Sequence, residues 1–198
     1  MWWINREVIS PALFLLAAAP ALAASCKSLA GFRLPQVTVT SAAAGAECRV
    51  AATLTPTADS DIKIEVWMPV SGWNGKYQAV GNGGWSGSIN YRAMAAAVQR
   101  GYATSSTDTG HAGGSASFAL GHPEKLIDYA YRSEHLMAVT AKALIAAYYG
   151  KGPRLSYWNG CSAGGKQALK EAQMYPADFD GIIAGAPAAN WTGRASQS

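Results

Sequence analysis

Residues 155–184 read LSYWNGCSAGGKQALKEAQMYPADFDGIIA, and this stretch carries the clearest indication of the fold. Residues 155–159 predict a strand, and residues 164–175 predict a helix. A loop at residues 176–178 then leads to a second strand at residues 181–184. A helix that joins two strands at this spacing indicates a parallel βαβ unit.

The junction of the first strand and the helix, Gly160-Cys161-Ser162-Ala163-Gly164, matches the pattern G-x-S-x-G. In this motif a sharp strand-to-helix turn strains the Ser backbone and lifts its hydroxyl above the edge of the sheet. Gly160 and Gly164 provide the room that such a turn needs. The pattern alone is weak, but the strand before it and the helix after it are the context it requires. Ser162 is therefore predicted to be a catalytic nucleophile.

The residues upstream of this unit also alternate between strand and helix. Strands are expected at residues 76–80 and 102–106, and helices at residues 91–100 and from about Pro123 to Tyr149. Helices placed between strands in this way indicate a mostly parallel, doubly wound α/β sheet.

A different pattern precedes residue 76. Residues 61–70 alternate apolar with polar or charged side chains and predict a strand. Residues 36–40 and 49–56 also predict strands, with residues 42–45 as the turn between them. These three segments are expected to form an antiparallel edge at the start of the sheet.

A nucleophilic serine also needs hydrogen-bond donors for the negative charge that develops on the carbonyl oxygen under attack. The backbone N–H of Ala163, at the start of the helix, is the expected first donor. Gly83 and Gly84, in the loop after the strand at residues 76–80, are expected to provide the second. The alternative is an ordinary glycine turn. A dinucleotide-binding loop is excluded, because the third glycine and an amino-terminal βαβ frame are missing.

A serine hydroxyl further needs an imidazole as general base and a carboxylate that orients it, and both follow the serine in this type of fold. The three histidines, His111, His122 and His135, all precede Ser162, and none is expected to be the base. Asp178 and Asp180 follow Ser162 but lie at the amino end of the next strand, whereas active groups gather at the carboxyl ends. Both are interpreted as structural, and the acid and base are expected beyond Ser198.

The amino terminus has the pattern of an export signal. Arg6 precedes an apolar stretch from Pro11 to Leu22, and small residues near Ala23 suit a signal peptidase. Residues 1–23 are predicted to be a signal peptide, which makes residues 24–198 a secreted or periplasmic chain. The alternatives are a membrane anchor, for which the stretch is short, and a lipoprotein acylated at Cys26.

Three cysteines are an odd number for an exported chain. Cys26 and Cys48 bracket a short segment and are expected to pair. Cys161 is then left over, and its partner is expected beyond Ser198. The alternative for Cys161 is a buried free thiol.

The overall composition indicates a globular domain, with 49% apolar and 14% charged residues. The net charge is +4, but the 16 Lys and Arg residues are scattered singly. A nucleic-acid partner is therefore not expected, because no basic run could follow a phosphate backbone.

Several motifs resemble those of one known family. They are residues 158–167 with their continuation through 171–176 and 178–187, together with residues 73–76, 81–84 and 106–111. Over nearly all of the mature chain they are similar to the tannase and feruloyl esterase family of α/β-hydrolases. The resemblance implies hydrolysis of esters of aromatic acids, such as gallate, ferulate or terephthalic monoesters, through a Ser nucleophile and an acyl-enzyme.

Carried over residue by residue, Ser162 matches the family nucleophile, and Cys161 matches a cysteine that bonds to a second cysteine beside the catalytic His. The family's acid, its His-Cys pair, its lid and the calcium site usually found in that lid have no counterpart before Ser198. The resemblance therefore implies the amino-terminal portion of an α/β-hydrolase catalytic domain, truncated after the strand that follows the nucleophile. We expect this portion to bind no metal or cofactor and to be inactive alone.

Two other functions stay open at this point. A secreted non-catalytic protein could use the scaffold only to bind phenolic or polysaccharide ligands, since fold does not determine function. An acyltransferase would keep the nucleophile but transfer the acyl group to an alcohol instead of water. Ligand binding that survives Ser162→Ala, with no ester turnover by any longer form of the protein, would favour the first. Product analysis with an added acceptor alcohol separates the second from hydrolysis. The expected partner is a small-molecule ester. Binding to nucleic acid or to a membrane is not expected.

Overall fold

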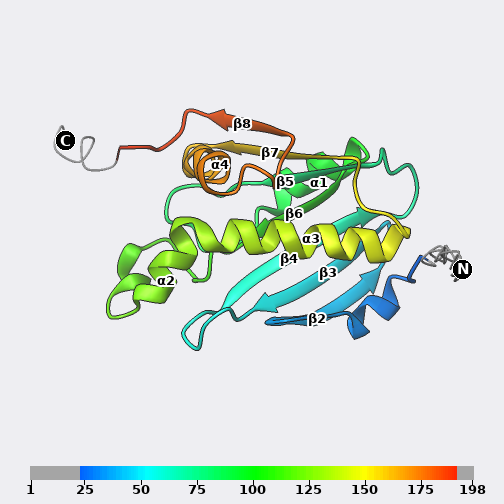
Figure 1. Ribbon diagram of the computed structural model, residues 1–198, viewed down its shortest axis with the longest axis horizontal. Coiled ribbons are helices and arrows are strands. Elements are labelled where there is room, and N and C mark those ends of the chain that lie inside the picture. The colour runs from blue at the N-terminus through cyan, green and yellow to red at the C-terminus, as the bar shows by residue number, and fades with distance from the viewer. Residues whose placement is uncertain (1–22, 191–198) are drawn as a thin grey trace, which may run out of the picture.

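The computed structural model describes residues 23–190, so the predicted signal peptide lies almost entirely outside the described residues. Within this range eight strands form one sheet in the order β1-β2-β3-β4-β6-β5-β7-β8 (Figure 1). The strands are β1 (Arg33–Leu34), β2 (Val37–Ala44), β3 (Glu47–Leu54), β4 (Ile62–Pro69), β5 (Lys76–Val80), β6 (Ala103–Thr107), β7 (Leu155–Cys161) and β8 (Gly181–Gly185). The helical segments are η1 (Lys27–Gly31), α1 (Tyr91–Gln99), η2 (Ala116–Ala119), α2 (Pro123–Ile127), η3 (Asp128–Arg132), α3 (Ser133–Tyr149) and α4 (Ala163–Met174). None of the helices in residues 23–190 is long and apolar enough to cross a membrane.

The sheet is mixed rather than mostly parallel. Strands β1 to β4 pair antiparallel in sequence order, and β4 also pairs antiparallel with β6. The pairs β5/β6, β5/β7 and β7/β8 are parallel. The α/β fold and its antiparallel edge are as expected, but the prediction of a mostly parallel sheet is wrong for the described residues. Strands β2, β3 and β4 follow one another through short links, which suit antiparallel pairing, whereas helical crossovers bring later strands back in parallel.

The predicted turn at residues 42–45 is also wrong for most of its length. Residues 42–44 extend β2 and pair with residues 48–50 of β3, and the chain reverses at Gly45 and Ala46. Alanine has a weak strand preference, but pairing with a neighbouring strand overrides it.

Helices cover both faces of the sheet. α1 packs on the face that carries Trp67 of β4, and Met94 is buried there. α3 crosses the other face, where Val66 and Met68 belong to the main core (Figure 1). Because successive strand residues point to opposite faces, the alternation along β4 separates the two cores. The doubly wound arrangement predicted from the sequence is confirmed.

Strands β5 and β7 are parallel neighbours from which the chain continues to opposite faces. β5 leads through residues 81–90 into α1, and β7 leads directly into α4, which packs with the main core on the α3 side. In open α/β sheets, ligands bind outside the carboxyl ends of strands that diverge in this way. The loop after β5 and the residue after β7 therefore lie where a ligand site is expected.

The helix expected from about Pro123 to Tyr149 is interrupted once. α2 runs into the π-helical turn η3 before α3 continues, and Gly150 ends α3 with φ of 71°. In the turn, the buried Asp128 accepts a hydrogen bond of 2.6 Å from Arg132 Nε. Side-chain periodicity does not reveal a single wide turn, because the α-helical turns on either side keep their normal spacing.

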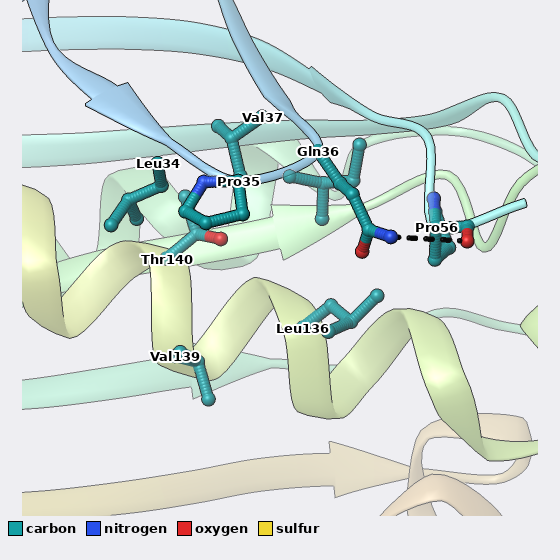
Figure 2. A pocket seen from close by; sticks show the side chains of 9 residues that line it. Leu34, Pro35, Gln36, Val37, Pro56, Leu136, Val139 and Thr140 are labelled. Atoms are coloured by element: carbon teal, nitrogen blue, oxygen red, sulfur yellow. Dashed lines mark hydrogen bonds between the residues drawn. The ribbon is translucent and has the colours of Figure 1, made fainter.

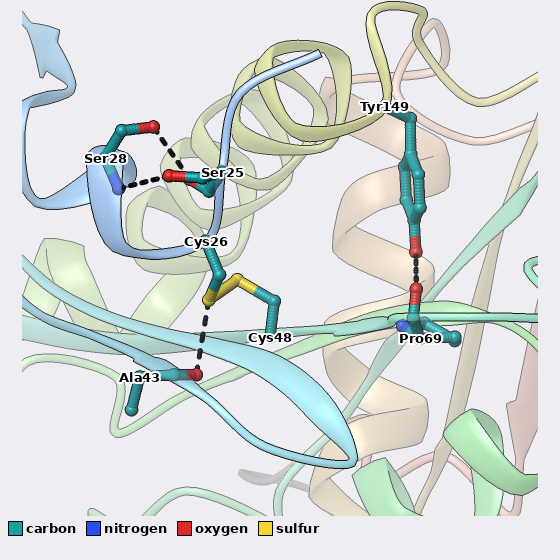
Figure 3. Close-up of a disulfide and its surroundings, with 7 residues drawn as sticks. All are labelled: Ser25, Cys26, Ser28, Ala43, Cys48, Pro69 and Tyr149. Carbon is teal, nitrogen blue, oxygen red and sulfur yellow. Dashed lines mark hydrogen bonds between the residues drawn. A yellow bond between two sulfur atoms is a disulfide. The ribbon is translucent and has the colours of Figure 1, made fainter.

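A disulfide joins the amino-terminal segment to the sheet. Cys26 pairs with Cys48 of β3 across a sequence separation of 22, and both residues are buried (Figure 3). In the chain-entropy description, closing a loop of this length stabilises the folded chain by about 3 kcal/mol. Close to it, the Tyr149 hydroxyl at the end of α3 donates a 2.7 Å hydrogen bond to Pro69 O at the end of β4 (Figure 3).

An apolar cavity of about 130 Å³ lies between the β1–β2 turn and α3 (Figure 2). Its lining includes Leu34, Pro35, Leu136 and Val139, and Gln36 closes one end through a 3.3 Å hydrogen bond to the Pro56 carbonyl. The lining contains no titratable side chain, so this cavity offers no general acid or base.

Candidate active site

Ser162 is the single-residue hinge between β7 and α4. Its backbone has φ of 60° and ψ of −118°, a conformation that costs a non-glycine residue about 1–3 kcal/mol. Its N–H donates to Gly185 O at 3.0 Å, and its carbonyl accepts from Ala188 N at 2.9 Å. The side chain is exposed, and its hydroxyl has no hydrogen-bond partner among residues 23–190. The hinge is thus strained, as the pattern predicts, and presents a free hydroxyl.

Glycines around the hinge allow the backbones of four segments to approach one another. A Cβ atom at Gly160 would lie 2.3 Å from Gly164 O, and one at Gly165 would lie 2.4 Å from Gly185 O. A Cβ atom at Gly164 would meet Asn82 O at 3.1 Å. Close packing of β7, α4, β8 and the loop after β5 therefore requires the two glycines of the pattern and Gly165.

Three backbone N–H groups beside the hinge have no acceptor among residues 23–190, namely those of Ala163, Gly83 and Gly84. Ala163 is the first residue of α4, whose amino-terminal N–H groups favour negative charge. The loop with Gly83 and Gly84 lies against this end of α4, because Gly164 N donates to Asn82 O at 2.9 Å. The structure thus brings both segments predicted to hold an oxyanion together.

Comparison with known proteins identifies the family. The family described as "Tannase and feruloyl esterase" matches residues 48–198. The chain belongs to the tannase and feruloyl esterase family. This tannase-family chain is 42% identical over 187 residues to an uncharacterized esterase of Xanthomonas campestris pv. campestris. The matched region covers 85% of this chain and 32% of the relative. It is also 42% identical over 144 residues to a probable feruloyl esterase B-1 of Aspergillus fumigatus, and this matched region covers 73% of this chain and 27% of the relative.

Solved structures agree with this assignment. Feruloyl esterase B from Aspergillus oryzae superposes with a TM-score of 0.79 at 35% identity, covering 84% of this chain and 37% of that one. A tannin acyl hydrolase from Aspergillus niger, at 23% identity and a TM-score of 0.67, shares the fold. These neighbours confirm the expected α/β-hydrolase fold. The tannase-family chain spans 27–32% of the length of the two curated relatives.

In this tannase-family chain, side chains that the sequence did not single out hold the glycine loop. The Asn82 side chain donates to Ser88 O and Thr107 O, each at 2.8 Å. Tyr129 OH donates to Gly84 O at 3.1 Å, and the π-helical turn η3 carries this tyrosine. In the sequence, the only indication of this support was one polar residue, Asn82, within a glycine-rich loop.

His111 also supports the loop, since its Nε2 donates to Trp85 O at 2.8 Å. The other two histidines lie elsewhere: His122 Nδ1 contacts Asp59 Oδ1 at 2.8 Å, and His135 Nδ1 contacts Asp178 Oδ2 at 2.6 Å. Each imidazole of residues 23–190 is thus engaged with a group other than Ser162.

Asp178 and Asp180 have the structural contacts expected of them. Asp178 contacts His135, and Asp180 Oδ2 accepts from Ser156 N at 2.7 Å, which holds the loop before β8 against the start of β7. Both lie before β8, whereas Ser162 follows the carboxyl end of β7. No group of three His, Cys, Asp or Glu side chains in residues 23–190 is arranged to hold a metal ion.

Cys161 is free and exposed, directly before the hinge. The alternative that it is a buried free thiol is therefore wrong. An exposed thiol at the end of β7 is accessible to a partner cysteine.

A buried carboxyl on α4 makes stability depend on pH. Both oxygens of Glu171 lack a hydrogen-bond partner among residues 23–190. Burial, followed by the charges of Glu134 and Asp178, raises the pKa of Glu171 from 4.5 to about 9. The folded state therefore keeps a proton that the unfolded chain releases above pH 4.5, so this group lowers the free energy of unfolding as pH rises from about 4.5 to 9.

Glu171→Gln is accordingly expected to raise the free energy of unfolding by at least about 2 kcal/mol at pH 8 and to change it little at pH 4.5. Urea unfolding of both proteins at the two pH values measures the effect. An equal change at both pH values would show that the carboxyl is not protonated in the folded state at pH 8.

Proposed function

We propose that this protein is a secreted or periplasmic serine carboxylesterase that hydrolyses esters of aromatic acids such as ferulate or gallate. The observation that carries the proposal is an exposed hydroxyl on a strained hinge, beside backbone N–H groups that have no acceptor within residues 23–190. Membership of a family whose relatives bear esterase names supports the reaction class. The aromatic substrate class is supported by the names of the feruloyl esterase relatives.

In the proposed reaction, a general base removes the proton of Ser162 Oγ as this oxygen attacks the ester carbonyl carbon. The carbonyl oxygen becomes an anion, which the N–H groups of Ala163 and of Gly83 or Gly84 stabilise. Collapse of the tetrahedral species breaks the bond to the alcohol, which leaves with the proton held by the base. Water then attacks the acyl-enzyme by the same steps and releases the aromatic acid.

We propose that the base and its orienting carboxylate come from polypeptide beyond Ser198. Two observations support this: each histidine in residues 23–190 is engaged away from Ser162, and the curated relatives are about three times as long. The exposed Cys161 is a suitable partner for a cysteine in that region. Below, "the complete enzyme" means a form that contains those residues.

Export is part of the same proposal. The apolar stretch after Arg6 has the pattern of a signal peptide, and a disulfide between Cys26 and Cys48 suits an oxidising compartment.

The test is hydrolysis of methyl ferulate and methyl gallate by residues 24–198 alone and by the complete enzyme. We expect turnover near background for residues 24–198, because without acid and base only oxyanion contacts and positioning remain. The complete enzyme should hydrolyse at least one ester and lose this activity on Ser162→Ala.

Two outcomes would contradict the proposal. Robust Ser162-dependent turnover by residues 24–198 would show that the base lies within them. Tight binding of either ester by the complete enzyme, without turnover and unchanged by Ser162→Ala, would indicate a binding protein instead.

A further inference from the structure

One buried link joins the glycine loop to α4. Asn82 N donates to Gln167 Oε1 at 3.0 Å, and Gln167 Nε2 donates to Asn82 Oδ1 at 3.3 Å. Gly164 N donates to Asn82 O at 2.9 Å. Asn82 therefore uses its backbone N–H, its backbone carbonyl and its side-chain oxygen to contact one helix.

The link controls where the loop lies, because the two backbones touch. A Cβ atom at Gly81 would lie 2.5 Å from Gly164 Cα and 2.9 Å from Gln167 Oε1. Where Gly81 meets Gly164, no side chain lies between the two backbones to absorb a shift. The separation between the N–H of Ala163 and those of Gly83 and Gly84 thus depends on the contacts of Asn82.

The surroundings leave Gln167 and Asn82 a single arrangement. Gln167 is 1% exposed and Asn82 is 7% exposed. Asn82 Nδ2 is already used by Ser88 O and Thr107 O, so the Asn82 amide cannot flip without losing these contacts. On its other side, Gln167 lies near the buried Glu134. Burial raises the pKa of the Glu134 carboxyl, and both Lys166 and the Gln167 amide oppose this rise. Every polar group of Asn82 is hydrogen-bonded, and buried polar groups that are all paired in this way are held rigidly.

We infer that Gln167, through Asn82, is a positioning residue that sets the separation of the two halves of the oxyanion hole. Gln167 touches neither substrate nor nucleophile in this role. The inference rests on the proposed function. It matters chemically because donors act on the transition state only within about 2.7–3.1 Å of the oxyanion, and a displacement of about 1 Å can cost about 10²-fold in rate.

The test uses Gln167→Met in the complete enzyme, since Met has a similar length but neither donates to Asn82 Oδ1 nor accepts well from Asn82 N. Active sites are counted by titration with a fluorophosphonate, so that kcat refers to folded protein only. We expect kcat to fall about 10-fold to 100-fold with KM within about 2-fold of wild type. The inhibition constant of an arylboronic acid, which forms a tetrahedral anion on a serine, should rise by the same factor as kcat falls.

Gln173→Met, at a more exposed position on the same helix, is the matched control and should leave both constants unchanged.

Gln167→Glu provides a second readout and covers the case in which the Met variant fails to fold. A protonated carboxyl reproduces both contacts with Asn82, whereas a carboxylate cannot donate. The activity of this variant relative to wild type should therefore rise as pH falls.

The outcomes separate the inference from the function on which it rests. An active wild type, together with a Met variant whose kcat and boronate affinity stay within threefold of it, would overturn the inference alone. Loss of folded sites with unchanged kcat per site would show a purely structural role and would also overturn it. A wild-type complete enzyme without Ser162-dependent turnover would overturn both.

Discussion

Replacing Ser162 by glycine is expected to abolish ester turnover by the complete enzyme and, at the same time, to make the protein more stable. The nucleophile is lost, which reduces turnover by at least about 10⁴-fold. The hinge at φ of 60° and ψ of −118° suits glycine better than serine, so relief of strain should raise the free energy of unfolding by about 1 kcal/mol.

Ser162→Ala is the matched variant, because it removes the hydroxyl but keeps a Cβ atom in the strained conformation. We expect it to lose turnover to the same degree without the gain in stability. Chemical unfolding and hydrolysis of methyl ferulate measure both effects in both variants. A glycine variant no more stable than the alanine variant would mean that the hinge stores no strain, and turnover retained by either would exclude Ser162 as the nucleophile.

Replacing Gly160 by alanine is expected to destabilise the hinge by about 3 kcal/mol or to prevent folding. The new Cβ atom would lie 2.3 Å from Gly164 O and 2.7 Å from Trp158 Nε1. To relieve these two clashes, β7 and the first turn of α4 would have to separate. Trp158 Nε1 would then lose its 3.0 Å hydrogen bond to Gly164 O. Protein that does fold should turn over ester far more slowly, because the same movement displaces Ser162 and the N–H of Ala163.

Gly152→Ala is the control, since a Cβ atom there meets nothing within 4 Å. This change should leave turnover unaffected and should alter the free energy of unfolding by no more than about 1 kcal/mol, with a gain expected from the stiffer unfolded chain. Thermal or urea unfolding of both variants measures the contrast. Equal stability of the two would show that close packing at Gly160 is not needed.

The parts of the site that could be predicted are those with a local signal. The G-x-S-x-G pattern lies between a strand and a helix, so the hinge at Ser162 followed from about ten consecutive residues. The glycine loop was found in the same way. The pairing of Cys26 with Cys48 followed from their short separation, which left Cys161 over.

The support for the loop had no comparable signal. Gln167 donates to a residue 85 positions earlier, and Tyr129 reaches back 45 positions to Gly84 O. A weaker sign existed on α4, where Ala163, Gln167 and Glu171 follow one another at a spacing of four and are all buried. Two polar residues on the buried face of a helix indicate partners across an interface, but they do not identify those partners.

The amino-acid sequence by itself determined the succession of the longer strands and helices, the strained serine between β7 and α4, and the glycines that admit it, because each depends on neighbours along the chain. Only the tertiary structure decided that β5 lies between β6 and β7, which brings the loop after β5 against the start of α4. It also decided which buried amide holds that loop. Strand order and long-range hydrogen bonds arise from how whole faces pack, and a local pattern carries no information about which face meets which.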